Sequence, residues 1–169
     1  MNIRTLEKIL YVEDDLDIQK IVTMSLEDIG GYKLMICDSG KEALIEAEKF
    51  IPDLFLLDVM IPVMDGPAIL LELRKNLKFK NTPAIFISAV AEGPELIKYR
   101  ELGVLGIIRK PFDPISISKT INVLYQSNQL LQENLIKQAE LEVQSYAVEY
   151  DAEVKSNLII PNILKSNHI

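Results

Sequence analysis

Aromatic residues and cysteine are scarce in this sequence. It has no Trp and only 5 Phe and 6 Tyr among 169 residues, so it lacks the aromatic platforms on which proteins stack single-stranded nucleic acid. The single Cys37 excludes an internal disulfide framework and a zinc site made of several cysteines. A lone thiol is typical of a reducing compartment.

Positive charge and long apolar runs are also lacking. The 18 basic residues are outnumbered by 25 acidic ones, which gives a net charge of -7, and so acidic a chain repels the phosphates of nucleic acid. No stretch approaches the roughly 18 apolar residues of a membrane span, and residues 1–8 lack the apolar core of a signal peptide. We therefore expect a cytoplasmic protein that binds neither membranes nor nucleic acid directly.

Residues 5–127 alternate short apolar runs with helical patterns. Hydrophobic residues make up 49% of the chain, enough for an ordinary core. Runs that are continuously apolar are typical of strands covered on both faces; here they are Ile9–Val12, Leu54–Leu57, Ala84–Ile87 and Gly106–Ile108. Tyr32–Ile36, which contains Lys33, is a weaker strand. Strands separated by helices favour parallel crossovers. The pattern predicts an α/β fold with a doubly wound, five-stranded parallel sheet.

Polar side chains follow four of the five runs: Glu13 and Asp14, then Asp58, Ser88 and Lys110. In the strand order 2-1-3-4-5 the first and third strands are neighbours, so their carboxylates converge at the edge where ligands bind. Converging carboxylates repel one another unless a cation neutralises them, and their oxygens suit Mg²⁺. Because a hydroxyl and an ammonium can hold further phosphoryl oxygens, the set indicates phosphoryl transfer onto a carboxylate.

These residues lie in four motifs that resemble those of response-regulator receiver domains of two-component signalling. The motifs are Lys8–Asp14 (KILYVED), Leu56–Gly66 (LLDVMIPVMDG), Ile87–Ala89 (ISA) and Arg109–Phe112 (RKPF). The resemblance covers residues 5–127, the receiver domain. It implies a flavodoxin-like sheet of strand order 2-1-3-4-5, as in chemotaxis regulators.

The resemblance also implies a role for each site residue. Asp58 would be the phosphoacceptor, with Ser88 and Lys110 binding the phosphoryl group. The phosphodonor would be a histidine kinase or a His phosphotransfer protein. Mg²⁺ would be the cofactor, held by Glu13 (through water), Asp14, Asp58 and the backbone carbonyl of Met60.

Ile107 departs from the family pattern, which places Tyr or Phe three residues before the Lys. In the family this ring swings inward on phosphorylation together with the switching hydroxyl, here Ser88, and Ile107 leaves that hydroxyl without its aromatic partner. A haloacid-dehalogenase-like phosphatase would also use an Asp nucleophile with Mg²⁺. However, Asp15-Leu16-Asp17 lies two residues too late for that motif, and no Asp pair follows Lys110.

A helical pattern without breakers runs from Pro114 to Pro161. Apolar residues from Ile117 to Leu135 follow heptad-like spacing, with Asn128 at a core position. We expect the extension 128–155 to form a coiled coil that makes the protein a homodimer. The alternatives are a broken helix packed on a domain, and a linker to an output domain that this chain lacks. Residues 156–169 form a tail without an assigned role.

The expected function is a phosphorylation-controlled switch that turns over no separate substrate and signals through protein contacts. It would catalyse its own phosphoryl transfer and a slow dephosphorylation. The resemblance implies that the side chains two residues after Asp58 and Ser88 flank the path of an attacking water. Here they are Met60 and Val90, which are apolar and cannot orient it. The alternatives are the input half of a longer effector and a dimerising pseudo-receiver scaffold.

Overall fold

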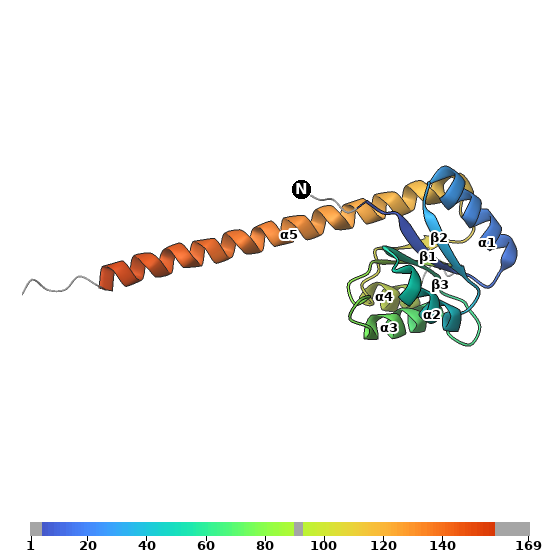
Figure 1. Ribbon diagram of the computed structural model, residues 1–169, viewed down its shortest axis with the longest axis horizontal. Helices are drawn as coiled ribbons and strands as arrows, with labels where there is room; N and C mark the ends of the chain where they lie inside the picture. The colour runs from blue at the N-terminus through green and yellow to red at the C-terminus, as the bar shows by residue number, and fades with distance from the viewer. Residues whose placement is uncertain (1–4, 90–92, 158–169) are drawn as a thin grey trace, which may run out of the picture. The chain divides into compact units, whose positions relative to one another are not determined.

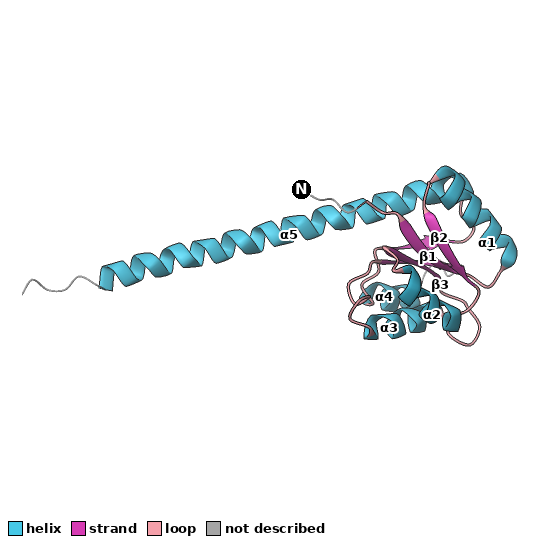
Figure 2. Ribbon diagram, viewed as in Figure 1, coloured by secondary structure: helices cyan, strands magenta, loops and turns pink. Residues whose placement is uncertain are grey.

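A five-stranded parallel sheet forms the centre of the computed structural model, which describes residues 5–89 and 93–157, with side chains as far as residue 147. The strands are β1 (Lys8–Val12), β2 (Lys33–Cys37), β3 (Leu54–Asp58), β4 (Ala84–Ser88) and β5 (Gly106–Arg109). Their order is β2-β1-β3-β4-β5, and Figure 2 draws the strands of the sheet in magenta, with β2, β1 and β3 labelled. The predicted α/β class and doubly wound order are confirmed. Every residue of β3 and β4 is buried, which explains their unbroken apolar sequences.

Helices cover both faces of the sheet (Figure 1). The core on one face includes residues of α2, α3 and α4, and the core on the other face includes residues of α1 and α5. The helices are α1 (Leu16–Thr23), α2 (Gly40–Phe50), α3 (Gly66–Lys75), α4 (Pro94–Glu101) and α5 (Pro114–Asn157). This arrangement leaves the carboxyl ends of the strands open to ligands.

Side-chain caps fix where the helices near that edge begin. The carboxylate of Asp15 accepts hydrogen bonds from the amides of Asp17 and Ile18 at the start of α1. Asp65 does the same for α3, by accepting from the amide of Ala68 at 2.8 Å. Each cap satisfies amides that have no partner within the helix. The loops that end β1 and β3 are thereby held in place.

The first helix departs from the sequence pattern at its end. The apolar spacing predicts an ordinary α-helix up to Ile29, but Met24–Ile29 form a π-helical turn, η1. Ser25 lies buried in this turn and its hydroxyl donates to the carbonyl of Pro114, the first residue of α5. This contact between distant parts of the chain is invisible to the local apolar pattern.

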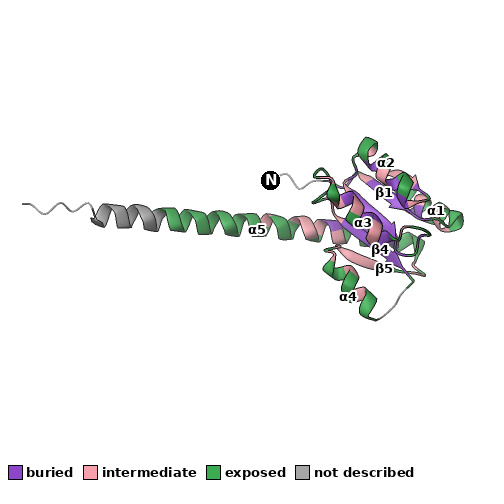
Figure 3. Cartoon of the chain, turned by 90° about the horizontal axis from the view of Figure 1, so that it is seen from below, coloured by how far each residue is buried: buried purple, intermediate pink, exposed green. Residues whose placement is uncertain are grey.

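The helix α5 is continuous to Asn157, as the sequence predicts, and belongs to two compact units, residues 1–129 and 130–169. In the first unit, Ile117, Ile121 and Tyr125 are buried in the core. This part of the stripe assigned to a coiled coil therefore packs against the sheet. In the second unit, large apolar side chains are exposed, green in Figure 3: Leu130, Leu131, Leu135, Ile136, Leu141, Val143 and Tyr146.

Two of the sequence predictions fall outside the described residues: Val90, and all of the tail 156–169 beyond Asn157. Within the described part of the chain, no helix combines the length and the apolar character that crossing a bilayer requires.

Candidate functional site

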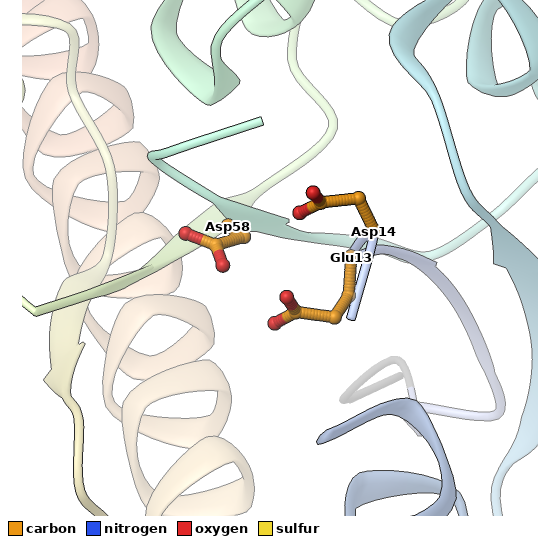
Figure 4. Close-up of side chains that lie close together, drawn as sticks. All are labelled: Glu13, Asp14 and Asp58. Carbon is orange, nitrogen blue, oxygen red and sulfur yellow. The ribbon is translucent and has the colours of Figure 1, made fainter. Parts of the chain in front are cut away.

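Three carboxylates meet at the carboxyl edge of β1 and β3. Glu13 and Asp14 follow β1, Asp58 ends β3, and the parallel pairing of these two strands brings their ends side by side. One oxygen from each carboxylate lies within 4.8 Å of the others. Figure 4 shows the three side chains turned toward a common space. The convergence predicted from the strand order is therefore observed.

Lys110, directly after β5, supplies the positive charge at this edge. Its Nζ donates to Glu13 Oε2 at 2.7 Å and also to Asp58 Oδ2. Both carboxylate side chains are at most 5% exposed, and that of Lys110 is 17% exposed. The ion pairs are consequently shielded from solvent. Charge interactions are stronger in such a shielded position than at an open surface.

Three carboxylates and one ammonium meet at this edge, and Asp15 lines the same cleft. Burial raises the pKa of Glu13, and the hydrogen bond from Lys110 opposes that rise. Burial alone would lower the pKa of Lys110, but its hydrogen bonds to Asp58 and Glu13 raise it. The ammonium thus stays charged, and the excess of carboxylates over this one ammonium suits a divalent cation with oxygen ligands. The residues present therefore fit Mg²⁺.

A cleft of about 250 Å³ opens over these groups. Met60 also lines it, and the Met60 amide donates to Asp58 Oδ1 at 2.8 Å, which orients the carboxylate. Ser88, by contrast, is fully buried at the end of β4 and is not among the lining residues. The structure therefore gathers the predicted acidic residues, Lys110 and Met60 around one space, whereas Ser88 lies deeper.

The loop after Asp58 depends on two unusual backbone positions. Gly66 lies so close to β3 that a Cβ there would collide with the carbonyl of Asp58. Val63 has a φ of 70° and occupies the centre of a γ-turn, in which the Met64 amide donates to the Pro62 carbonyl at 2.8 Å. Such a turn is strained for a β-branched residue. The loop is therefore shaped by tight backbone packing as well as by its side chains.

Tyr11 belongs to the site, although sequence reasoning assigned it only to a buried strand. Its hydroxyl donates to Glu13 Oε2 at 3.2 Å from within the core. Residues two apart on a strand point to the same face, and a buried tyrosine usually has a hydrogen-bond partner. These two rules together could have identified the pair from the sequence.

The doubly wound parallel sheet, with helices on both faces, defines the class as a flavodoxin-like α/β domain. The chain belongs to the response regulator receiver domain family, whose model matches residues 9–122. This match agrees with the four motifs found in the sequence.

Relatives support the same assignment. The chain is 32% identical over 135 residues to "Probable transcriptional regulator ycf29" of Pyropia yezoensis, covering 80% of this chain and 58% of that protein. It is 35% identical over 129 residues to "Probable transcriptional regulator ycf27" of Porphyra purpurea, covering 76% and 51%. The chain thus spans little more than half the length of these relatives.

Solved structures agree with the fold. The chemotaxis response regulator CheY4 of Vibrio cholerae matches with a TM-score of 0.66 and 30% identity, covering 71% of this chain and 99% of that one. The receiver domain of the Francisella response regulator 1452 matches with a TM-score of 0.64 and 30% identity, covering 72% and 98%. The flavodoxin-like fold expected from the motifs is therefore confirmed.

Proposed function

We propose that this receiver domain is a switch that accepts a phosphoryl group on Asp58. The observation that carries the proposal is the contact of Lys110 with both Asp58 and Glu13 inside an acidic cleft. An oxygen of Asp58 forms a bond to phosphorus while the phosphorus–nitrogen bond of a phosphohistidine donor breaks and the imidazole leaves. Lys110 then pairs with a phosphoryl oxygen, which limits the build-up of negative charge.

Mg²⁺ fits the remaining acidic groups. Asp14, Asp58 and the backbone carbonyl of Met60 would hold it directly, and Glu13 would hold it through water. When bound, the cation would neutralise charge on the phosphoryl oxygens. Ser88 would donate its hydroxyl to another phosphoryl oxygen, which requires the end of β4 to adjust because Ser88 is now buried.

The donor in this proposal is a histidine kinase or a His phosphotransfer protein. No separate substrate is turned over, because the group that receives the phosphoryl is part of the protein itself. The domain catalyses its own phosphorylation and a slow loss of phosphate, and it signals through contacts with other proteins.

The test is phosphorylation of the full chain by a small phosphodonor with Mg²⁺, read by intact mass. Wild type should gain one phosphoryl group, and Asp58→Asn should gain none. Asp14→Asn should also stay unlabelled, because it removes a metal ligand. Asp17→Asn is the matched control, since Asp17 is an exposed carboxylate on α1, and it should label like wild type. Labelling of wild type in EDTA would contradict the role of the metal.

The second unit supports a further part of the proposal, a homodimer formed through α5. The side chains of Leu131, Leu135 and Val143 are more than half exposed. With Ala139 and Tyr146 they recur every three or four residues, so they share one face of the helix. A helix this long does not bury such a stripe by itself. A second copy of the same helix, packed along this stripe as in a coiled coil, is the partner that we propose.

A longer effector is the second candidate. The relatives named as transcriptional regulators are nearly twice as long as the matched part of this chain. Under this alternative, α5 links the receiver to an output domain. The mass of the protein made by the source cells distinguishes the two: 19.1 kDa corresponds to this chain alone, and a clearly larger mass favours the effector.

A further inference from the structure

Tyr11 is a polar side chain at the centre of an apolar layer. It lies on β1, is fully buried, and belongs to the core that includes Ile9, Leu56 and Ile87. An apolar residue would fill this position without needing a hydrogen bond. The phenol hydroxyl reaches the end of the strand and donates to Glu13 Oε2 at 3.2 Å. The tyrosine therefore connects the core to the acidic site.

The two oxygens of Glu13 have different surroundings. Oε2 accepts from both Tyr11 and Lys110, at 3.2 and 2.7 Å. Oε1 accepts a long hydrogen bond from the amide of Asp15, at 3.4 Å. Two donors on one oxygen fix the rotation of the carboxylate and leave the other oxygen less engaged. Glu13 lines the cleft, so that oxygen is the one available to a cation or to the water around it.

The Lys110 ammonium donates to two carboxylates, whereas the Tyr11 hydroxyl has a single proton, which it donates to Glu13. The ammonium also contacts Asp58, and in the proposed function it moves to a phosphoryl oxygen. Glu13 is buried and would then lose its charged donor, which is costly for a carboxylate away from water. The Tyr11 hydroxyl is the donor that stays on Oε2 in both situations. It therefore keeps Glu13 in the same orientation before and after phosphoryl transfer.

We propose that Tyr11 is a positioning residue: its hydroxyl orients Glu13 so that the acidic cluster binds a divalent cation. The inference rests on the proposed function, because it assumes that Mg²⁺ binds at Glu13, Asp14 and Asp58. It adds a group from the interior of the sheet to the site. Removing the hydrogen-bond partner of a direct metal ligand typically weakens metal binding about 10- to 100-fold, and because Glu13 holds the cation through water we expect the loss of the Tyr11 hydroxyl to lie at the lower end of that range.

The experiment compares full-length wild type, Tyr11→Phe and Tyr99→Phe. Tyr99 is the matched control, since it is a partly buried tyrosine that packs against Phe86 on the other face of the sheet. Mg²⁺ is titrated and followed by the backbone amide resonances of the loop after Asp58. We expect a dissociation constant about tenfold higher for Tyr11→Phe and unchanged for Tyr99→Phe.

A second readout separates positioning from packing. The chain has no Trp, so tyrosine emission is directly observable. The emission of a phenol that is hydrogen-bonded to a carboxylate changes when a cation approaches that carboxylate. The emission of wild type and Tyr99→Phe should therefore change on addition of Mg²⁺, and that of Tyr11→Phe should not. In wild type carrying ¹³Cζ-labelled tyrosine, the Tyr11 resonance should shift on addition of Mg²⁺; this measurement needs no variant to fold.

The outcomes are distinct. Wild-type Mg²⁺ affinity in folded Tyr11→Phe, or a Tyr11 resonance that does not move while Mg²⁺ saturates wild type, overturns the positioning role and leaves the proposed function intact. Failure of wild type itself to bind Mg²⁺ contradicts the proposed metal site, and the positioning role with it.

Discussion

The two parts of α5 have similar apolar patterns in opposite environments. In the unit formed by residues 1–129, Ile117 and Ile121 are at most 1% exposed. In the unit formed by residues 130–169, Leu131 and Leu135 are 56% and 51% exposed. One continuous helix thus contains a stretch buried in a core and a stretch whose apolar side chains remain in water.

This difference shows what helical periodicity does and does not specify. The spacing of Ile117, Ile121, Leu131 and Leu135 determines which face of the helix is apolar. It does not determine whether a sheet or another helix covers that face. Burying a Leu or Ile side chain stabilises a protein by about 1.5–3 kcal/mol, so the second stretch has a substantial free energy available for association.

The largest expected effect comes from removing the second stretch. A chain ending at Gln126 keeps the buried residues of α5 up to Tyr125. We expect it to sediment as a monomer at tens of micromolar, whereas the full chain sediments as a dimer irrespective of phosphorylation. Phosphorylation of Asp58 should be the same in both. If the shortened chain and the full chain have the same oligomeric state, whether monomer or dimer, the second stretch is not the interface.

At pH 8, the rate of thiol labelling should be about a thousandfold lower for a cysteine in the core than for a cysteine on the exposed part of α5. Burial raises the pKa of the Cys37 thiol to about 12, and Glu42 and Glu46 add to the rise. A cysteine introduced as Leu141→Cys lies at an exposed position of α5 and should react at nearly the rate of a free thiol. Equal rates by mass spectrometry would show that the core around Cys37 opens readily.

The same pKa shift predicts a pH dependence of stability. The folded state keeps a proton on Cys37 that the unfolded thiol loses near its ordinary pKa of about 8.5. The free energy of unfolding should therefore fall as the pH rises above that value, and more in wild type than in Cys37→Ala. Urea denaturation at pH 7.5 and pH 9.5 measures the difference.

Truncating one side chain in the buried part of α5 should affect the stability of the receiver, and truncating one in the exposed part should affect the dimer. Ile121→Ala creates a cavity in the core and should lower the free energy of unfolding by about 3 kcal/mol. Leu135→Ala should leave the unfolding of the receiver nearly unchanged and weaken the dimer instead. Urea denaturation of the full chain carrying either substitution measures the stability of the receiver, and dilution of the full chain measures the strength of the dimer. A large loss of receiver stability in Leu135→Ala would contradict the division into two units.

The smallest expected effect concerns the lifetime of the phosphorylated state. The Met60 side chain lines the cleft and offers no hydrogen bond to an attacking water. The double variant Met60→Asn/Val90→Glu should lose phosphate several-fold faster than wild type. The rate should not depend on residues 127–169, because the chemistry lies within the receiver. If the double variant decays no faster, these side chains do not set the lifetime.

Much of the fold and site follows from local sequence. Continuous apolar runs locate four of the five strands, and a weaker run that contains Lys33 locates β2. The polar residues after these runs locate Glu13, Asp58 and Lys110. The exceptions come from contacts between distant segments. The π-helical turn η1 accompanies the contact of Ser25 with Pro114. The depth of Ser88 depends on how the neighbouring strands and helices pack around it, which a strand-end position alone does not specify.

The γ-turn at Val63 has a consequence for how the sequence can evolve. A positive φ at a β-branched residue costs about 1–3 kcal/mol, and the Val63 side chain is fully exposed, so no buried contact offsets that cost. Valine and glycine codons differ by a single base, and glycine adopts this conformation without strain. A more stable protein therefore lies one base change away, and a random screen for heat resistance should recover Val63→Gly.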